Sequence, residues 1–154
     1  MSFVRTAIAY VELSRPINGL IAFVSVFLGA VFASGSFTSS TLIVAVSAFL
    51  VLSAGNAIND FCDYRIDVIN KPLRPIPSGC IQRQHALVFS LILLLIGLLL
   101  GVLTGSMYAI IIVFIVSITL FFYAIWLKKT PLIGNIVVGI LTGVTFVAGG
   151  VTVR

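Results

Sequence analysis

The sequence predicts an all-α fold, a polytopic bundle of transmembrane helices, on three observations. Hydrophobic residues make up 60% of the 154 positions and charged residues only 8%, whereas an average soluble domain carries about 25% charged residues. Apolar runs of about 18 residues or more recur, which is the length that a helix needs to cross about 30 Å of hydrocarbon. The cations gather in alternate joins between these runs. These features exclude an ordinary soluble domain.

We expect five membrane spans within one domain that covers residues 1–154. The first follows Pro16 and is long enough to be a retained span rather than a signal peptide. The second ends where the carboxylates begin at Asp60, and the third follows a proline-rich join that ends at His85. Gly105 separates the third span from the fourth, and a Lys-Lys-Thr-Pro join precedes the fifth. The expected spans are about 17–34, 41–59, 86–104, 107–127 and 132–153.

The cations predict how these spans are oriented. All nine Lys and Arg residues except Arg154 lie before the first span or in the joins that follow the second and fourth spans. Because cytosolic loops are enriched in Lys and Arg, we expect a multi-pass protein of the cell membrane with a cytosolic N-terminus. No basic stretch is interleaved with exposed aromatics, so we expect no nucleic acid partner. The sequence identifies no protein partner. The cations on the cytosolic side are Arg5, Arg15, Arg65, Lys71, Arg74, Arg83, Lys128 and Lys129.

Three of the four acidic residues, Asp60, Asp63 and Asp67, lie within eight positions at the end of the second span. On a helix they share a sector of about 60° with Asn56, and Asn59 lies to one side. Carboxylates so close to each other and to the bilayer are costly unless they serve a cavity or a partner. Mg²⁺ takes carboxylate and phosphate oxygens, so we expect Asp60 and Asp63 to hold one ion and Asp67 to help with a second. The alternative is a solvated helix end whose carboxylates pair with Arg65, Lys71 and Arg74.

The join after the carboxylates is rich in proline, which forbids a helix and favours a stiff turn. Lys71 and Arg74 lie within it, next to the carboxylates, and both side chains bind phosphate oxygens well. A diphosphate with its metal therefore fits this segment. Taken alone, these cations are also explained as topology determinants.

Other polar residues lie at the same membrane depth. Tyr123 and Lys128 lie near the cytosolic end of the fourth span, where an aromatic belt with basic anchors is the alternative to a binding role. Glu12 and Arg15 are expected to form an interfacial ion pair, with a role at the site left open.

Glycines at helical spacing predict close packing between spans. They form one stripe on the third span and a second on the fifth. These positions are Gly97, Gly101 and Gly105, and Gly139 and Gly143.

The segment GNAINDFCDYRID at 55–67, followed by RPIPSG at 74–79, resembles the NDxxDxxxD motif and following loop of the UbiA superfamily of intramembrane prenyltransferases. The segments ELSRPIN at 12–18 and KKTPLIGN at 128–135 also resemble this family. Within this superfamily, the combination of GNAIND at 55–60 and RPIPSG at 74–79 is most similar to the archaeal digeranylgeranylglyceryl phosphate synthase branch. The resemblance implies a bundle of about nine helices, with two Asp-rich motifs facing each other across a cavity open to the cytosol.

The resemblance also implies roles for individual residues. Arg74 would cap the diphosphate, the Tyr123 ring would lie near the allylic carbon, and the Lys128 ammonium would bind the diphosphate. The Tyr123–Lys128 spacing is one residue wider than the family's usual spacing. The implied metal ligands are Asp60, Asp63 and Asp67. The implied catalytic residues are Asp60, Asp63, Asp67, Tyr123 and Lys128. The implied diphosphate-binding residues are Asn56, Asn59, Lys71, Arg74 and Lys128.

The implied reaction is Mg²⁺-dependent prenyl transfer from geranylgeranyl diphosphate to the hydroxyl of geranylgeranylglyceryl phosphate, a step in archaeal ether-lipid synthesis. The partners are then a prenyl diphosphate, a lipid-like acceptor and membrane lipid. An aromatic or tetrapyrrole acceptor stays open, and so does an inactive truncated membrane module. No acidic residue follows Asp67, so a second Asp-rich motif is missing. We expect the chain to hold the first five of the family's helices, to bind Mg²⁺-diphosphate weakly and to turn over little.

Overall fold

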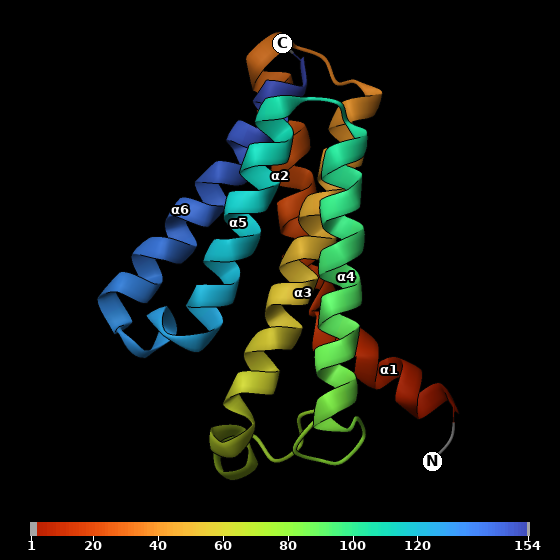
Figure 1. Cartoon of the computed structure of the whole chain (residues 1–154), viewed down its shortest axis with the longest axis vertical. Helices are drawn as coiled ribbons and strands as arrows, with labels where there is room; N and C mark the ends of the chain where they lie inside the picture. Colours follow the sequence, from red (N-terminus) through yellow and green to blue (C-terminus); the bar gives the residue numbers. More distant parts are fainter. Residues whose placement is uncertain (1–2, 154) are drawn as a thin grey trace.

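The computed structural model describes residues 3–153, apart from the side chains of Phe3, Lys129 and Pro131, and this part of the chain contains helices and turns but no strand. Figure 1 shows the longer helices side by side in one bundle. The helices are α1 Phe3–Ser14, α2 Pro16–Ser34, α3 Ser39–Asn70, α4 Arg83–Leu103, α5 Met107–Ile125, η1 Leu127–Lys129, α6 Pro131–Gly150 and η2 Val151–Val153. Arg154, which was expected on the non-cytosolic face, lies outside the described residues.

Five helices are long and apolar enough to cross a membrane. They correspond to α2, α3, α4, α5 and most of α6 together with η2. Each would satisfy its own backbone groups inside hydrocarbon, where water is absent. The predicted all-α class with five spans is confirmed, and the chain is an integral membrane protein.

The second span is longer than predicted, because α3 continues to Asn70 rather than ending near residue 59. The carboxylates end the apolar run, but no glycine or proline follows Gly55 until Pro72, so nothing interrupts the backbone helix. All three carboxylates are therefore held on a rigid helix. The fourth span is shorter than predicted, since α5 ends at Ile125 and gives way to a 3₁₀ turn, η1.

Helix α1 was not predicted, because its 12 residues are too few to cross a membrane. It leaves the bundle obliquely (Figure 1). Its buried side chains, Ala9 and Leu13, pack in a cluster with Ala57 of α3 and with residues of the join 71–82 and of α4. We call this end of the molecule, which carries the carboxylates and most of the cations, the charged end.

At the opposite end, α2 and α6 approach backbone to backbone. A Cβ added at Gly149 would overlap the carbonyl of Val26, and one added at Gly29 would overlap the carbonyl of Phe146. The buried hydroxyl of Thr152 also forms a hydrogen bond of 2.7 Å with that of Thr41. Helix α6 is thus fixed to α2 and α3 at this end.

The predicted glycine packing is found on one helix but not on the other. A Cβ at Gly97 would lie 2.7 Å from Val51 Cγ2, and one at Gly101 would lie 3.3 Å from Val113. Gly105 lies beyond the helix, with a φ of 68° that favours glycine. No described atom lies within 4 Å of a Cβ added at Gly139 or Gly143. Within residues 3–153 this pair therefore has no packing partner, and the packing predicted for it stays a prediction.

Candidate functional site

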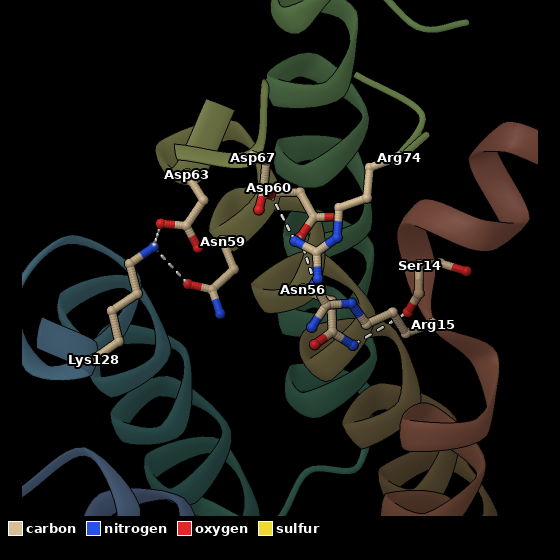
Figure 2. A network of polar contacts seen from close by, with 9 residues as sticks. All are labelled: Ser14, Arg15, Asn56, Asn59, Asp60, Asp63, Asp67, Arg74 and Lys128. Atoms are coloured by element: carbon tan, nitrogen blue, oxygen red, sulfur yellow. Dashed lines mark hydrogen bonds and ion pairs between the residues drawn. The ribbon is translucent and has the colours of Figure 1, made fainter. Parts of the chain in front are cut away.

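Two carboxylates share one arginine at the charged end of α3. Asp60 and Asp67 are seven positions apart, which places them about 20° from each other around a helix. Arg74 Nη1 donates to Asp60 Oδ1 at 3.1 Å and to Asp67 Oδ2 at 2.6 Å (Figure 2). The join carries Arg74 to this point through tight turns, in which the Arg74 N–H donates to the Lys71 carbonyl at 3.1 Å. Both carboxylates are buried, so charge-assisted bonds of this kind offset their desolvation.

A second arginine reaches Asp60 from the corner between α1 and α2. Arg15 Nη2 donates to Asp60 Oδ1, the same oxygen that accepts from Arg74. The Arg15 backbone is left-handed, with φ 49° and ψ 67°, which costs a non-glycine residue about 1–2 kcal/mol. Pro16 follows and disfavours the right-handed helical region at this position, so the chain breaks here. The corner thus aims the guanidinium at α3.

The role of Arg15 was missed in the sequence. Glu12 is exposed and forms no ion pair within residues 3–153, so the predicted Glu12–Arg15 pair is wrong. The signal that could have found Arg15 is its place directly before Pro16, at the boundary of the first span.

Asn56 stabilises the same corner between α1 and α2. Its Nδ2 donates to the carbonyl of Ser14, the last residue of α1, at 3.2 Å. A carbonyl at a helix end has no partner within the helix, so this bond satisfies it. The Asn56 side chain therefore fixes the corner that carries Arg15.

The third carboxylate points to a different neighbour. Lys128 Nζ, on η1, donates to Asn59 Oδ1 at 3.0 Å and pairs with Asp63 Oδ1 at 2.7 Å. Asn59 and Asp63 are one turn apart on α3, so one ammonium reaches both. Figure 2 shows this group beside the Asp60–Arg74 group. The 3₁₀ turn after Trp126 carries Lys128 toward α3, despite the wider Tyr123–Lys128 spacing.

The structure thus groups the carboxylates as Asp60 with Asp67, and Asp63 apart, where the sequence suggested Asp60 with Asp63. The reason is helical: Asp63 lies about 60° around α3 from Asp60, on the edge that faces η1. Lys71 is exposed, and its side chain contacts no charged group of the described chain. Arg65 is also exposed and unpaired within residues 3–153.

An apolar cavity of about 400 Å³ lies among α2, α3, α5 and α6. Most of its walls are aliphatic, such as Val44 and Leu120. Polar groups line it toward the charged end, where both networks begin: Arg15, Asn18, Asn56, Asn59 and Tyr123. A long apolar group with a charged head fits this arrangement, because its tail and head would meet surfaces of matching polarity.

The donor set is suited to a metal bound together with an anion. Within residues 3–153, no three His, Cys, Asp or Glu side chains come together as a ready metal cage. Mg²⁺ commonly takes only one or two carboxylates, keeps several waters and accepts phosphate oxygens for the rest. The carboxylates of Asp60, Asp63 and Asp67 are the oxygen ligands that such an ion prefers.

The sequence matches the UbiA prenyltransferase family over residues 22–154. The chain belongs to this family. A UbiA relative, the digeranylgeranylglyceryl phosphate synthase of Methanothermobacter thermautotrophicus, is 42% identical over 142 residues, which are 92% of this chain and 50% of the relative. The chain spans about half the length of the curated relatives it matches.

Two solved structures also match. One, described as digeranylgeranylglyceryl phosphate synthase in membranes, is 40% identical with a TM-score of 0.91, and the match covers 97% of this chain and 54% of that one. The other, a UbiA homolog from Archaeoglobus fulgidus bound to DMAPP and Mg²⁺, is 17% identical with a TM-score of 0.81, over 94% of this chain and 54% of that one. The second likeness concerns the fold alone.

Proposed function

We propose that the protein transfers a geranylgeranyl group from geranylgeranyl diphosphate to the hydroxyl of geranylgeranylglyceryl phosphate, with Mg²⁺, in ether-lipid synthesis. The observation that carries the proposal is the apolar cavity whose polar end meets two networks of carboxylates and cations. The digeranylgeranylglyceryl phosphate synthases among the relatives support the choice of substrates.

The cations would exchange partners when a diphosphate binds. In the structure, Arg15 and Arg74 are neutralised by Asp60 and Asp67. A guanidinium fork binds phosphate oxygens as readily as carboxylate oxygens. Arg15 and Arg74 would therefore turn toward the diphosphate and free carboxylate oxygens for a metal.

The Lys128 network would bind the diphosphate from the α5–α6 side. Lys128 Nζ already lies among oxygen acceptors, Asn59 Oδ1 and Asp63 Oδ1. Tyr123, like Asn59, lines the cavity, where the face of its ring would stabilise an allylic cation by about 0.5–2 kcal/mol. Lys71 remains a predicted diphosphate ligand, although its side chain contacts no charged group in the described part of the chain.

The carboxylates of Asp60, Asp63 and Asp67 would hold Mg²⁺, which when bound supplies positive charge that neutralises the diphosphate leaving group. The bond between C1 of the prenyl chain and the diphosphate oxygen would break and diphosphate would leave, while the acceptor hydroxyl oxygen would bond to C1 and its proton would pass to the departing diphosphate. The apolar walls keep water from the allylic carbon. We place the N-terminus and the charged end on the cytosolic side, because the cations gather there.

The experiment is incubation of the protein, reconstituted in lipid, with labelled geranylgeranyl diphosphate, Mg²⁺ and a choice of acceptors. We expect label to enter geranylgeranylglyceryl phosphate slowly, since no acidic residue follows Asp67 to supply a second Asp-rich motif, and we expect a chelator to stop the transfer. Transfer only to 4-hydroxybenzoate or another aromatic acid would contradict the proposed acceptor. Binding of the diphosphate without transfer to any acceptor would contradict an enzymatic role.

Arg74→Met is expected to weaken the binding of Mg²⁺-geranylgeranyl diphosphate to the chain by about 10- to 100-fold, since a hydrogen bond to a charged group contributes about 1.5–3 kcal/mol. The measurement is a calorimetric titration of each variant in detergent with geranylgeranyl diphosphate and Mg²⁺. The matched control is Arg65→Met, the same change at an exposed arginine without an ion-pair partner in the described chain. Equal losses in both variants would mean that only the overall positive charge matters.

A further inference from the structure

Helix α1 has an apolar face that no described residue covers. Val4, Ile8 and Val11 recur at i, i+4 and i+7, which places them on one side of the helix. They are 64%, 61% and 57% exposed. The other side of α1, with Ala9 and Leu13, is the one that packs on the bundle. The helix is therefore apolar on two faces, of which the bundle uses one.

One of the two edges of α1 between these faces is charged. Arg5 and Glu12 are seven positions apart and thus lie on one edge, next to the exposed aliphatic face. A helix with an aliphatic face beside a charged edge is the pattern of a helix that lies in a membrane surface. The packed face makes α1 part of the bundle, so it does not have to bind lipid by itself.

The length of α2 places α1, which precedes it, at the boundary of the membrane. Its 19 residues extend about 28 Å, close to the thickness of the hydrocarbon core of about 30 Å. The chain breaks at Arg15, directly before this span, and α1 then leaves the bundle obliquely (Figure 1). Aliphatic exposure resumes at Ile17 and Leu20, on the first turns of α2. Exposed aliphatic side chains therefore lie on both sides of the break at Arg15.

We propose that α1 lies in the surface of the membrane, with Val4, Ile8 and Val11 inserted among the lipids. The occupant is lipid rather than a second copy of the chain, since three aliphatic side chains offer at most a few hundred Å². A stable protein interface buries about 800 Å² on each partner. Insertion of about 5–10 Å suits a stripe of this width.

The experiment compares two adjacent positions of the same helix, Val11 on the aliphatic face and Glu12 on the charged edge. Each is replaced by cysteine in a chain whose Cys62 and Cys80 are replaced by alanine, labelled with an environment-sensitive fluorophore and reconstituted in phosphatidylcholine–phosphatidylglycerol vesicles. We expect the Val11→Cys label to emit at shorter wavelength and to be quenched by lipids with a nitroxide near the carbonyl. The Glu12→Cys label should be quenched by iodide in the water.

Two outcomes would overturn the proposal. Equal, water-like emission at both positions would place the aliphatic face in solvent. Emission at short wavelength without quenching by lipid nitroxides would mean that protein covers it, as in a dimer. If the cysteine-free chain does not fold, the same contrast is measured with Val11→Trp and Glu12→Trp in the native background. Brominated lipids then serve as the quencher, and the unsubstituted chain gives the background fluorescence of Trp126.

Discussion

Gly149→Ala is expected to destabilise the bundle by at least about 2–3 kcal/mol, the upper part of the range for overpacked cores. The added methyl group would overlap the carbonyl of Val26, with the carbonyl carbon 2.8 Å away and the Ala30 nitrogen 3.0 Å away. These are backbone atoms, so no side-chain rotation relieves the clash and α2 and α6 must separate. The hydrogen bond between Thr41 and Thr152 would be strained in the same movement. The measurement is unfolding in mixed detergent micelles, followed by circular dichroism.

The matched control is Gly143→Ala on the same helix. No described atom lies within 4 Å of the added Cβ, so only the intrinsic preference of alanine for a helix remains, which favours the variant by up to about 1 kcal/mol. We expect its stability to be unchanged or increased. Similar losses in both variants would show that the close approach of α2 and α6 is not what stabilises this end.

Asp60→Asn is expected to reduce the rate of prenyl transfer by about 100- to 1,000-fold, the loss that follows removal of one group that stabilises developing charge. One Asp60 oxygen accepts from both Arg15 and Arg74. An amide keeps the size of the side chain but supplies no charge, either to the two guanidinium groups or to a metal. Because the side chain is buried, water cannot replace what is lost. The measurement is the transfer assay across a range of Mg²⁺ concentrations.

Glu12→Gln is the control for this variant. It makes the same change of carboxylate to amide at the fourth acidic residue, which is exposed and unpaired in the described chain. We expect unchanged transfer. A thermal unfolding curve for each variant distinguishes a loss of site chemistry from a loss of fold. If the Asp60→Asn variant is slow but its rate depends on the Mg²⁺ concentration just as the unsubstituted chain's rate does, Asp60 is not a metal ligand.

The membrane class and the number of spans could be predicted because the bilayer imposes length and polarity on each segment separately. The end of α3 could not be predicted in the same way. Hydropathy marks where the chain leaves the hydrocarbon, whereas the helix ends where its backbone is interrupted, beyond Asn70. Helix α1 was missed because a short helix with apolar residues on two faces has neither the length of a span nor a single stripe.

The sequence pointed to most of the residues that form the two polar networks, and it offered Arg74 among several possible partners of the carboxylates, but it did not say which cation meets which carboxylate. Spacing on α3 placed the carboxylates on one side of the helix, yet the choice between Arg74 and Lys128 as partner depends on where the join and η1 return to it. The Arg15–Asp60 contact joins residues 45 positions apart, so the position of Arg15 before Pro16 could mark it as special but could not name Asp60 as its partner. The glycines of α6 show the same limit, because spacing alone does not say whether a neighbouring helix is present.

The left-handed backbone at Arg15 implies a compromise between stability and function. Glycine would adopt this conformation without the cost that a side chain incurs, but it has no guanidinium to place against Asp60. The chain therefore retains a less stable corner in exchange for a fixed cation beside the cavity. Local strain held in place by surrounding packing is a common way to pre-organise a binding group. In this protein the packing of α1 and the bond from Asn56 to Ser14 hold that corner.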